Sequence, residues 1–369
     1  MKYYIIAGEA SGDLHGSNLM KALLKEDPKA DIRFWGGDLM QTVGGSIVTH
    51  YKERSFMGFA EVIMNLKTIL GFIKSCKKDI ESFKPDVIVF IDNSGFNLRI
   101  AKWAKEEGYK THYYISPQVW ASRANRVKKI KRYVDAMYTI LPFEKEFYDK
   151  HGYEVNFVGH PLIDAVSYRE LVDEMAFRDS YKLSNKAIIA LLPGSRKQEI
   201  KKMLDVMLSV VDDFTDYQFV IAGAPSQDFS FYQSIIQSRD IAFVDNKTYD
   251  LLSISFAALV TSGTATLETA LFKVPQVVCY KASNISYQIA KRIVTLKFIS
   301  LVNLIMDREV VTELIQGDLN TKRLKKELEA ILNPEKREQL FLDYYELEKK
   351  LGGKGASENT AKLIYKAIS

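Results

Sequence analysis

The chain has few of the features that mark secreted or membrane-spanning proteins. It contains only two cysteines, Cys76 and Cys279, which lie far apart and form no CxxC pair. A disulfide framework is therefore excluded, and a reducing cytoplasm is expected. No stretch of about 18 uncharged apolar residues occurs, so we expect no segment to span a bilayer. The first apolar run is too short for a signal peptide and is typical of a strand.

The chain also lacks a strong excess of charge. Lys and Arg number 51 against 46 Asp and Glu, which gives a net charge of +5. This excess is too small to indicate nucleic-acid binding, but it is compatible with an anionic surface or a phosphate-bearing ligand. With 369 residues, of which 47% are hydrophobic and 26% charged, the chain is expected to form a globular protein of about two domains.

Short apolar runs alternate with longer amphipathic segments along most of the chain. Near-continuous apolar strands separated by segments of helix length are typical of parallel sheets covered by helices on both faces. The runs form two series, which predict an α/β protein with two such sheets. The first series comprises residues 3–7, 32–35, 87–91, 111–115, 137–141 and 155–158, and the second comprises residues 188–192, 219–222, 241–244, 258–261 and 277–280.

A charged helical segment after Pro161 separates the two series. We therefore expect an N-terminal domain over residues 1–163 and a C-terminal domain over residues 164–345. Residues 346–369 form a helical tail, whose last helix begins near residue 358 and carries apolar side chains on one face. An apolar face needs a partner, so we expect this helix to dock on the N-terminal domain or on a partner subunit.

Two turns of the first series are candidate ligand sites, because ligands of open parallel sheets bind at the carboxyl ends of the strands. The turn over residues 8–16 is rich in small residues, but its glycine spacing is not that of the dinucleotide-binding motif. Asp92 follows the strongly apolar run 87–91, where partial burial would raise the pKa of its carboxyl towards that of a general base. A simple turn or N-cap aspartate is the alternative interpretation of Asp92.

Two turns of the second series offer donors to an anion. The turn Pro193-Gly194-Ser195-Arg196 combines a helix start with a guanidinium, which favours a diphosphate. In Ser262-Gly263-Thr264, hydroxyls and a glycine precede a helix whose Glu268 can accept hydrogen bonds from a ribose diol. Ordinary capped helix starts are the alternative for both turns. Together the turns predict a nucleotide-diphosphate donor held by the second domain, facing the first domain across a cleft.

One apolar segment is a candidate for contact with lipid. As a helix, residues 56–73 place most of their apolar side chains, among them Leu70, on one stripe that is expected to face the core. Met57, Met64 and Phe72 fall on the other side, which predicts contact with acyl chains or a membrane surface. A helix buried on two sides is the alternative.

Residues 111–134 contain no acidic residue and end in a cluster of Arg and Lys. This pattern favours phosphate headgroups or a phosphorylated acceptor, and RNA binding or a solvated basic helix are the alternatives. The five histidines show no metal-ligand spacing, so no metal site is predicted.

A series of motifs, in order over most of the chain, resembles the lipid-A-disaccharide synthase family. The matching stretches are GEASGDLHG (8–16), MGFAEV (57–62), IDNSGFN (91–97), YYISPQVWA (113–121), LPFEKEFY (141–148), FVGHPLID (157–164), LLPGSR (191–196), SGTATLE (262–268) and SLVNLI (300–305). The resemblance implies a GT-B fold, in which two Rossmann-like domains flank a cleft and a helical tail follows.

The resemblance also implies an activity and its setting. Members of this family are inverting glycosyltransferases that move 2,3-diacylglucosamine from its UDP conjugate to the 6-hydroxyl of 2,3-diacylglucosamine 1-phosphate (lipid X). The products are the β-1,6-linked lipid A disaccharide 1-phosphate and UDP, and no cofactor or metal is required. The family implies a peripheral enzyme on the anionic cytoplasmic face of the inner membrane, and its members can form homodimers with exchanged C-terminal segments.

Site residues are carried over from the family position by position. Asp92 matches an essential aspartate and is the expected general base, with Asp13 as the alternative. Arg196 is expected to neutralise the charge that develops on departing UDP. The remaining substrate-binding positions are Gly194, Ser195, Ser262, Gly263, Thr264 and Glu268 in the nucleotide turns, Glu9, Ser11 and Gly12 in the first loop, and Asn303.

One departure from the family pattern leaves other functions open. Ser94-Gly95 stands where the family has Pro-Asp, so a second carboxylate is missing beside Asp92. The alternatives are another GT-B enzyme, such as a UDP-sugar 2-epimerase or a glycosyltransferase with a soluble acceptor, a dinucleotide oxidoreductase, and an inactive sugar-nucleotide-binding protein.

Overall fold

The structure is a computed structural model, and it describes residues 1–54, 66–122, 124–283, 287 and 296–369. The chain folds into two compact units. Unit 1 comprises Met1–Asp164 and Leu351–Ser369, and unit 2 comprises Ala165–Lys350. The unit boundaries therefore lie after residues 164 and 350. The sequence pattern predicts domain boundaries after residues 163 and 345. The end of the chain returns to unit 1.

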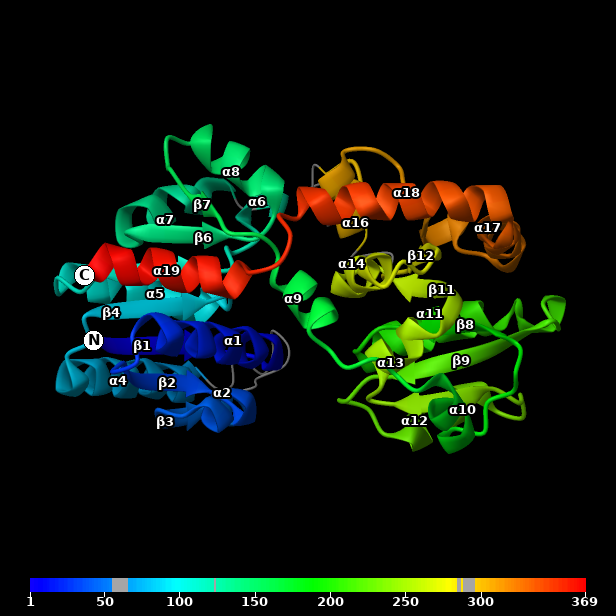
Figure 1. Ribbon diagram of the computed structural model, residues 1–369, viewed down its shortest axis with the longest axis horizontal. Helices are drawn as coiled ribbons and strands as arrows, with labels where there is room; N and C mark the ends of the chain where they lie inside the picture. The colour runs from blue at the N-terminus through cyan, green and yellow to red at the C-terminus, as the bar shows by residue number, and fades with distance from the viewer. Residues whose placement is uncertain (55–65, 123, 284–286, 288–295) are drawn as a thin grey trace. The chain divides into compact units, whose positions relative to one another are not determined.

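Unit 1 is built on a parallel sheet of seven strands in the order β3-β2-β1-β4-β5-β6-β7 (Figure 1). The strand order reverses between β1 and β4, and such a reversal is the point where doubly wound sheets bind ligands. The strands are β1 (Lys2–Ala7), β2 (Asp31–Gly36), β3 (Ser46–His50), β4 (Val87–Ile91), β5 (Thr111–Tyr114), β6 (Ala136–Thr139) and β7 (Asn156–Phe157).

Helices cover both faces of this sheet, which explains why its central strands are apolar throughout. Along β1, Tyr4 and Ile6 belong to one core cluster and Tyr3 and Ile5 to the other, because successive side chains of a strand point to opposite faces. The described helices of unit 1 are α1 (Ala10–Glu26), α2 (Asp38–Val43), α4 (Leu66–Phe83), α5 (Ser94–Glu106), α6 (Val119–Ser122), α7 (Val127–Tyr133), α8 (Pro142–Asp149) and α19 (Ala356–Ile368), and α9 (Pro161–Ser167) runs across the unit boundary.

The last helix, α19, docks on unit 1 beside α1 (Figure 1). Its Ala361 and Ile364 are fully buried in the core cluster that contains Leu19 and Leu23 of α1. The carboxylate of Asp164 accepts hydrogen bonds from the backbone N–H groups at the start of the helix, at Gly355 (2.7 Å) and Ala356 (3.1 Å). In the structure, α19 therefore forms part of the core of unit 1.

Unit 2 repeats the same architecture with a six-stranded parallel sheet in the order β10-β9-β8-β11-β12-β13. Its order reverses between β8 and β11. The strands are β8 (Ala187–Leu192), β9 (Tyr217–Gly223), β10 (Ala242–Asp245), β11 (Ser255–Thr261), β12 (Gln276–Tyr280) and β13 (Glu313–Ile315). The described helices are α10 (Glu174–Ser180), α11 (Lys197–Leu208), α12 (Phe229–Ile236), α13 (Thr248–Ser253), α14 (Thr264–Leu271), α16 (Leu301–Met306), α17 (Thr321–Leu332) and α18 (Pro334–Lys350).

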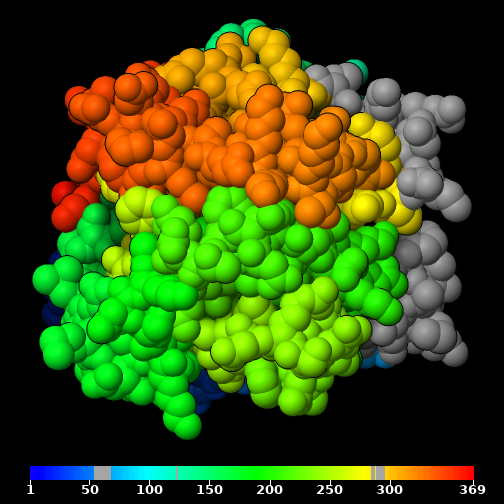
Figure 2. Space-filling view, turned by 90° about the vertical axis from the view of Figure 1, so that its right-hand side faces the viewer, coloured from blue at the N-terminus to red at the C-terminus, as the bar shows by residue number. Residues whose placement is uncertain are grey.

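Polar contacts tie α17 to the segment that follows α11. The hydroxyls of Ser209, just after α11, and Thr321, which begins α17, lie 2.8 Å apart, and Lys325 pairs with Asp213 at 2.7 Å. Figure 2 shows the orange surface of this late segment bordering the green surface of the segment that carries β8 and β9. Each unit has a layered α/β structure, and its sheet has its own switch point.

Candidate functional site

The turns singled out from the sequence flank the two switch points. In unit 1, the turn after β1 begins at Gly8 and the turn after β4 begins at Asp92, and these strands are neighbours. In unit 2, the turns after β8 and β11 begin at Pro193 and Ser262, and these strands are neighbours too. Each sheet therefore brings together two of the expected turns at its carboxyl edge.

Asp92 lies in an unusual stretch of backbone. Asp92 and Asn93 both have positive φ angles, of 44° and 39°, a left-handed conformation that is costly for residues other than glycine. Burial, together with the negative charge of nearby Glu9, raises the pKa of the Asp92 carboxyl. A raised pKa brings a carboxylate closer to the strength that a general base needs.

The two turns of unit 1 fit closely against each other. A Cβ atom added to Gly8 would lie 1.8 Å from Nδ2 of Asn93, so a larger residue at this position would displace the Asn93 side chain. The close approach brings Glu9 to Asp92, while Ser11 is exposed in the first turn of α1. Gly12 is buried, where a Cβ atom would lie 3.2 Å from Cβ of Ala7. The glycines of this motif therefore permit close packing of the loop.

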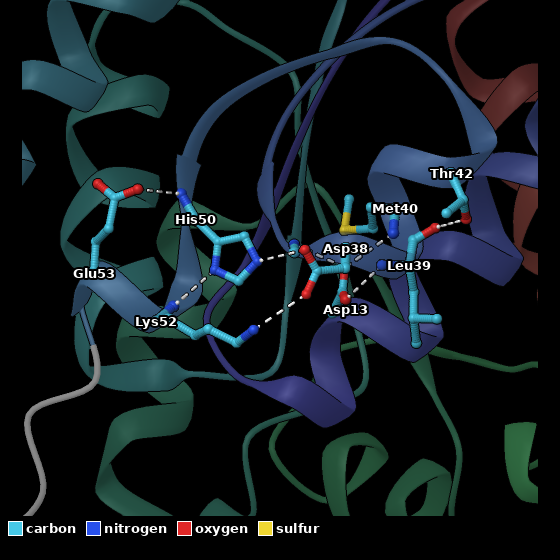
Figure 3. A network of polar contacts seen from close by, with 9 residues as sticks. Asp13, Asp38, Leu39, Met40, Thr42, His50, Lys52 and Glu53 are labelled. Carbon is cyan, nitrogen blue, oxygen red and sulfur yellow. Dashed lines mark hydrogen bonds and ion pairs between the residues drawn. The ribbon is translucent and has the colours of Figure 1, made fainter.

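Asp13, in the first turn of α1, has a structural role (Figure 3). It is 3% exposed, and its carboxylate accepts three backbone hydrogen bonds, from Gly37 (2.8 Å), Leu39 (3.0 Å) and Met40 (3.0 Å). These donors begin α2, so Asp13 holds that helix against α1. The neighbouring Asp38 pairs with His50 (3.4 Å) and Lys52 (3.2 Å), which extends the same network to the surface.

Glu144, which the sequence pattern does not single out, is a buried carboxyl in the first turn of α8. Glu144 is 1% exposed and accepts hydrogen bonds from the backbone N–H groups of Ile140 (3.2 Å) and Leu141 (3.0 Å) and from Nε1 of Trp120 (3.2 Å). Burial raises the pKa of Glu144 to about 7. Its place three residues after the N-cap of α8 is the sequence signal that could have revealed a capping role.

In unit 2, the turn after β8 forms the N-terminus of α11. Gly194 has a φ of +103°, and a Cβ atom there would lie 2.4 Å from Oε2 of Glu199. Glu199 accepts a hydrogen bond from the N–H of Ser195 (3.2 Å), and the N-cap of α11 is Arg196. Arg196 and Ser195 are exposed. A carboxylate thus already occupies part of the expected anion site, at the position where a capping glutamate is common.

A second loop braces this turn. The carbonyl oxygen of Ser195 accepts hydrogen bonds from Oγ of Ser226 (3.1 Å) and Nε2 of Gln227 (3.2 Å), which follow β9. No residue pattern links Ser226 and Gln227 to the turn 31 residues before Ser226, so the sequence does not predict these contacts.

The turn after β11 brings the other expected nucleotide residues together. The N-cap of α14 is Gly263, and both Gly263 and Thr264 are exposed. The hydroxyl of Ser262 donates to the carbonyl of Ile299 (3.0 Å). Glu268 accepts a hydrogen bond from the hydroxyl of Tyr249 (2.9 Å), and burial raises the pKa of its carboxyl.

Asn303 supports this region from inside. It is fully buried, its Nδ2 donates to the carbonyl of Val311 (2.8 Å) and to Glu313 (2.9 Å), and its Oδ1 accepts from the N–H groups of Val310 (2.8 Å) and Val311 (3.0 Å). Its amide therefore has no group left for a ligand, and it holds the loop between α16 and β13.

The expected lipid-facing residues are only partly described. Met57 and Met64 lie outside the described residues. Phe72 is half-buried, with its ring edge-on to Trp35 at 6.2 Å between centroids, whereas Leu70 is 53% exposed. The expected orientation of this helix is therefore wrong at these two positions, because α4 turns Phe72 and Cys76 towards the sheet.

The basic segment lies partly on α7, where Lys128, Lys129, Lys131 and Arg132 are exposed. Within the ranges that the structure describes, no helix is long and apolar enough to cross a membrane.

Solved structures of sugar-nucleotide enzymes share this fold. The UDP-bound structure of MnaA from S. aureus aligns with a TM-score of 0.69 and 17% identity, covering 100% of this chain and 97% of that one. A UDP-GlcNAc 2-epimerase from Neisseria meningitidis, bound to UDP-GlcNAc, aligns with a TM-score of 0.66 and 13% identity over 100% and 99% of the two chains. At these identities the likeness shows the GT-B fold alone.

Sequence comparison identifies the family. The lipid-A-disaccharide synthetase family model matches residues 3–367. The lipid-A-disaccharide synthase of Syntrophus aciditrophicus is 40% identical over 97% of this chain and 95% of its own length. Those of Geobacter metallireducens and Coxiella burnetii are 37% and 34% identical, and each alignment covers 99% of this chain and at least 96% of the relative. The chain therefore belongs to the lipid-A-disaccharide synthase family.

Proposed function

We propose that this protein transfers 2,3-diacylglucosamine from its UDP conjugate to the 6-hydroxyl of lipid X. The observation that carries the proposal is the likeness to enzymes named lipid-A-disaccharide synthase over almost the whole chain, at 34–40% identity. The products are a β-1,6-linked disaccharide 1-phosphate and UDP. Inversion at the anomeric carbon requires one in-line displacement, so the chain has to supply a base on one side and stabilise a leaving diphosphate on the other.

Asp92 is the proposed base. Its raised pKa and its position at the switch point of unit 1 suit a carboxylate that takes the proton of the acceptor hydroxyl as the new C–O bond forms. Asp13 is less suited, since three backbone N–H groups already engage its oxygens.

Unit 2 is the proposed donor-binding unit. The exposed N-termini of α11 and α14, with the exposed Arg196, offer N–H groups and a positive charge to the UDP diphosphate, whose charge grows as the glycosidic bond breaks. Glu268 is the proposed partner of the ribose hydroxyls. Glu199 accepts from Ser195 in the described structure, so diphosphate binding at this turn requires that carboxylate to move.

The setting of the reaction is part of the proposal. Lipid substrates favour a peripheral protein on the anionic cytoplasmic face of the inner membrane, with the exposed basic residues of α7 towards the headgroups. Leu70 joins Met57 and Met64 as a candidate for the apolar contact, and Phe72 contributes less because it packs on Trp35. A homodimer that exchanges α19 between subunits is compatible with the contacts of this helix on unit 1.

The test is direct synthesis. Purified protein is incubated with UDP-2,3-diacylglucosamine and lipid X, and the disaccharide 1-phosphate is sought by mass spectrometry. Formation of the disaccharide is expected, and its absence under conditions where the protein binds UDP would reject the function. Conversion of unacylated UDP-GlcNAc to a 2-epimer would instead support an epimerase, which the shared fold permits.

Two variants test the assigned roles. Asp92→Asn is expected to keep UDP affinity and lose most turnover, and near-normal turnover would reject Asp92 as the base. Arg196→Ala is expected to weaken UDP binding and to lower turnover. Unchanged kinetics would mean that the diphosphate does not bind at Arg196.

A further inference from the structure

The backbone at Asp92 has an uncommon conformation. Two consecutive non-glycine residues, Asp92 and Asn93, have positive φ angles. Each residue in such a conformation costs free energy and persists only where the surrounding structure enforces it. Strained backbone of this kind concentrates at functional sites, so the groups that enforce it are themselves of functional interest.

Two buried side chains converge on the carbonyl oxygen of Asp92. The hydroxyl of Tyr113, on β5, donates a hydrogen bond to this oxygen. Nδ2 of Asn97, in the first turn of α5, donates to the same oxygen at 2.8 Å and to the carbonyl of Ile91 at 3.1 Å. Tyr113 and Asn97 are both 0% exposed, so water does not compete for these bonds.

These bonds fix the turn from two directions. Tyr113 approaches from the strand next to β4, and Asn97 approaches from the helix that follows the turn. Burial, and then the negative charge of Asp92, raise the pKa of Tyr113 well above its ordinary value, so the phenol remains a donor at physiological pH. The support reaches the carbonyl and therefore does not compete with the proton that the carboxylate is to accept.

We propose that Tyr113 and Asn97 are positioning residues for Asp92, which hold its backbone so that the carboxylate stays in place to deprotonate the acceptor hydroxyl. The proposal rests on the proposed function of Asp92 as the base. Tyr113 and Asn97 themselves touch no substrate in this scheme. Their effect on catalysis is expected because small displacements of a reacting group reduce the rate far more than they reduce substrate binding.

The variant Tyr113→Phe tests the proposal, because it removes one hydroxyl and little volume. Tyr153→Phe is a matched control, since the hydroxyl of Tyr153 is also buried in unit 1 and also donates to a backbone carbonyl, that of Val134 at 3.0 Å. Both variants are expected to lower the unfolding midpoint by similar amounts. Tyr113→Phe is expected to lower kcat about 10–100-fold with both KM values within about twofold, whereas Tyr153→Phe keeps its kcat.

Equal kcat values for the two variants would overturn the proposal, and so would a loss for Tyr113→Phe that appears only in KM. Asn97→Ala provides a second measurement with the same expected split between kcat and KM, should Tyr113→Phe fold poorly. The variant Asp92→Asn distinguishes a failure of the positioning role from a failure of the proposed role of Asp92 as the base. If Asp92→Asn stays active, the base assignment fails, whereas an inactive Asp92→Asn with a fully active Tyr113→Phe refutes the positioning role alone.

Discussion

Replacing Asp13 by Asn separates a structural carboxylate from a catalytic one. Oδ1 of Asp13 accepts from Gly37 and Met40, and Oδ2 accepts from Leu39. The amide nitrogen of Asn cannot accept the third bond, and the charge at the start of α2 is lost. A hydrogen bond to a charged group contributes about 1.5–3 kcal/mol, and a charge at a helix N-terminus about 0.3–1 kcal/mol. Asp13→Asn should therefore destabilise unit 1 by about 2–4 kcal/mol.

The assay combines unfolding with kinetics. A loss of this size lowers the midpoint of thermal unfolding by about 4–16 °C, at about 2–4 °C for each kcal/mol. Turnover measured well below the new midpoint should remain near normal, since Asp13 faces backbone donors and not a substrate. If Asp13→Asn kept its stability but lost turnover, this reasoning would be refuted and a catalytic role of Asp13 would be supported. Asp92→Asn should show the reverse pattern. The raised pKa of Asp92 means that its charged form destabilises the folded state at neutral pH, so the neutral amide should preserve or increase stability.

The remaining predictions concern buried groups. The pKa of Glu144 is raised by burial to about 7 from 4.5, so the stability of unit 1 should fall as pH rises between these values. In urea titrations, the free energy of unfolding of Glu144→Gln should lack a decrease of roughly 2–4 kcal/mol over this pH range. A pH profile identical to that of the unsubstituted protein would contradict the raised pKa of Glu144. Ile364→Ala should cost about 2–5 kcal/mol in the same titration, whereas the exposed Lys362→Ala should change stability by less than about 0.5 kcal/mol; equal effects would mean that α19 is not part of the core. Tyr249→Phe should weaken UDP binding severalfold by calorimetry, because Glu268 loses the hydroxyl that orients it, and unchanged affinity would exclude that role.

The fold was largely predictable because buried parallel strands are apolar on both faces. The runs expected at residues 87–91 and 188–192 correspond to β4 and β8. The two strands that the sequence analysis missed, β3 and β13, lie at the edges of their sheets. Ser46–His50 and Glu313–Ile315 are short and only partly buried, so neither carries the continuous apolar pattern of a central strand.

The sequence predicts which turns lie at the switch points of the two sheets. Asp92 and Ser262 follow central strands, and the order of the strands brings their turns to the switch points. The supporting contacts were not predictable, because they join residues distant in sequence, such as Tyr113 with Asp92 and Gln227 with Ser195. Motif matching alone cannot separate a residue that contacts substrate from one such as Asn303, whose amide is consumed by its own loop.

The return of α19 to unit 1 has a consequence for biosynthesis. During translation, the sheet of residues 1–164 leaves the ribosome long before its last helix exists, and all of unit 2 must be made in between. Until Ala361 and Ile364 arrive, the apolar side chains of α1 that pack against them stay uncovered in the nascent chain. A polypeptide truncated by even its final helix would therefore present chaperones and proteases with an unfinished domain at its N-terminal end, not merely a frayed C-terminus.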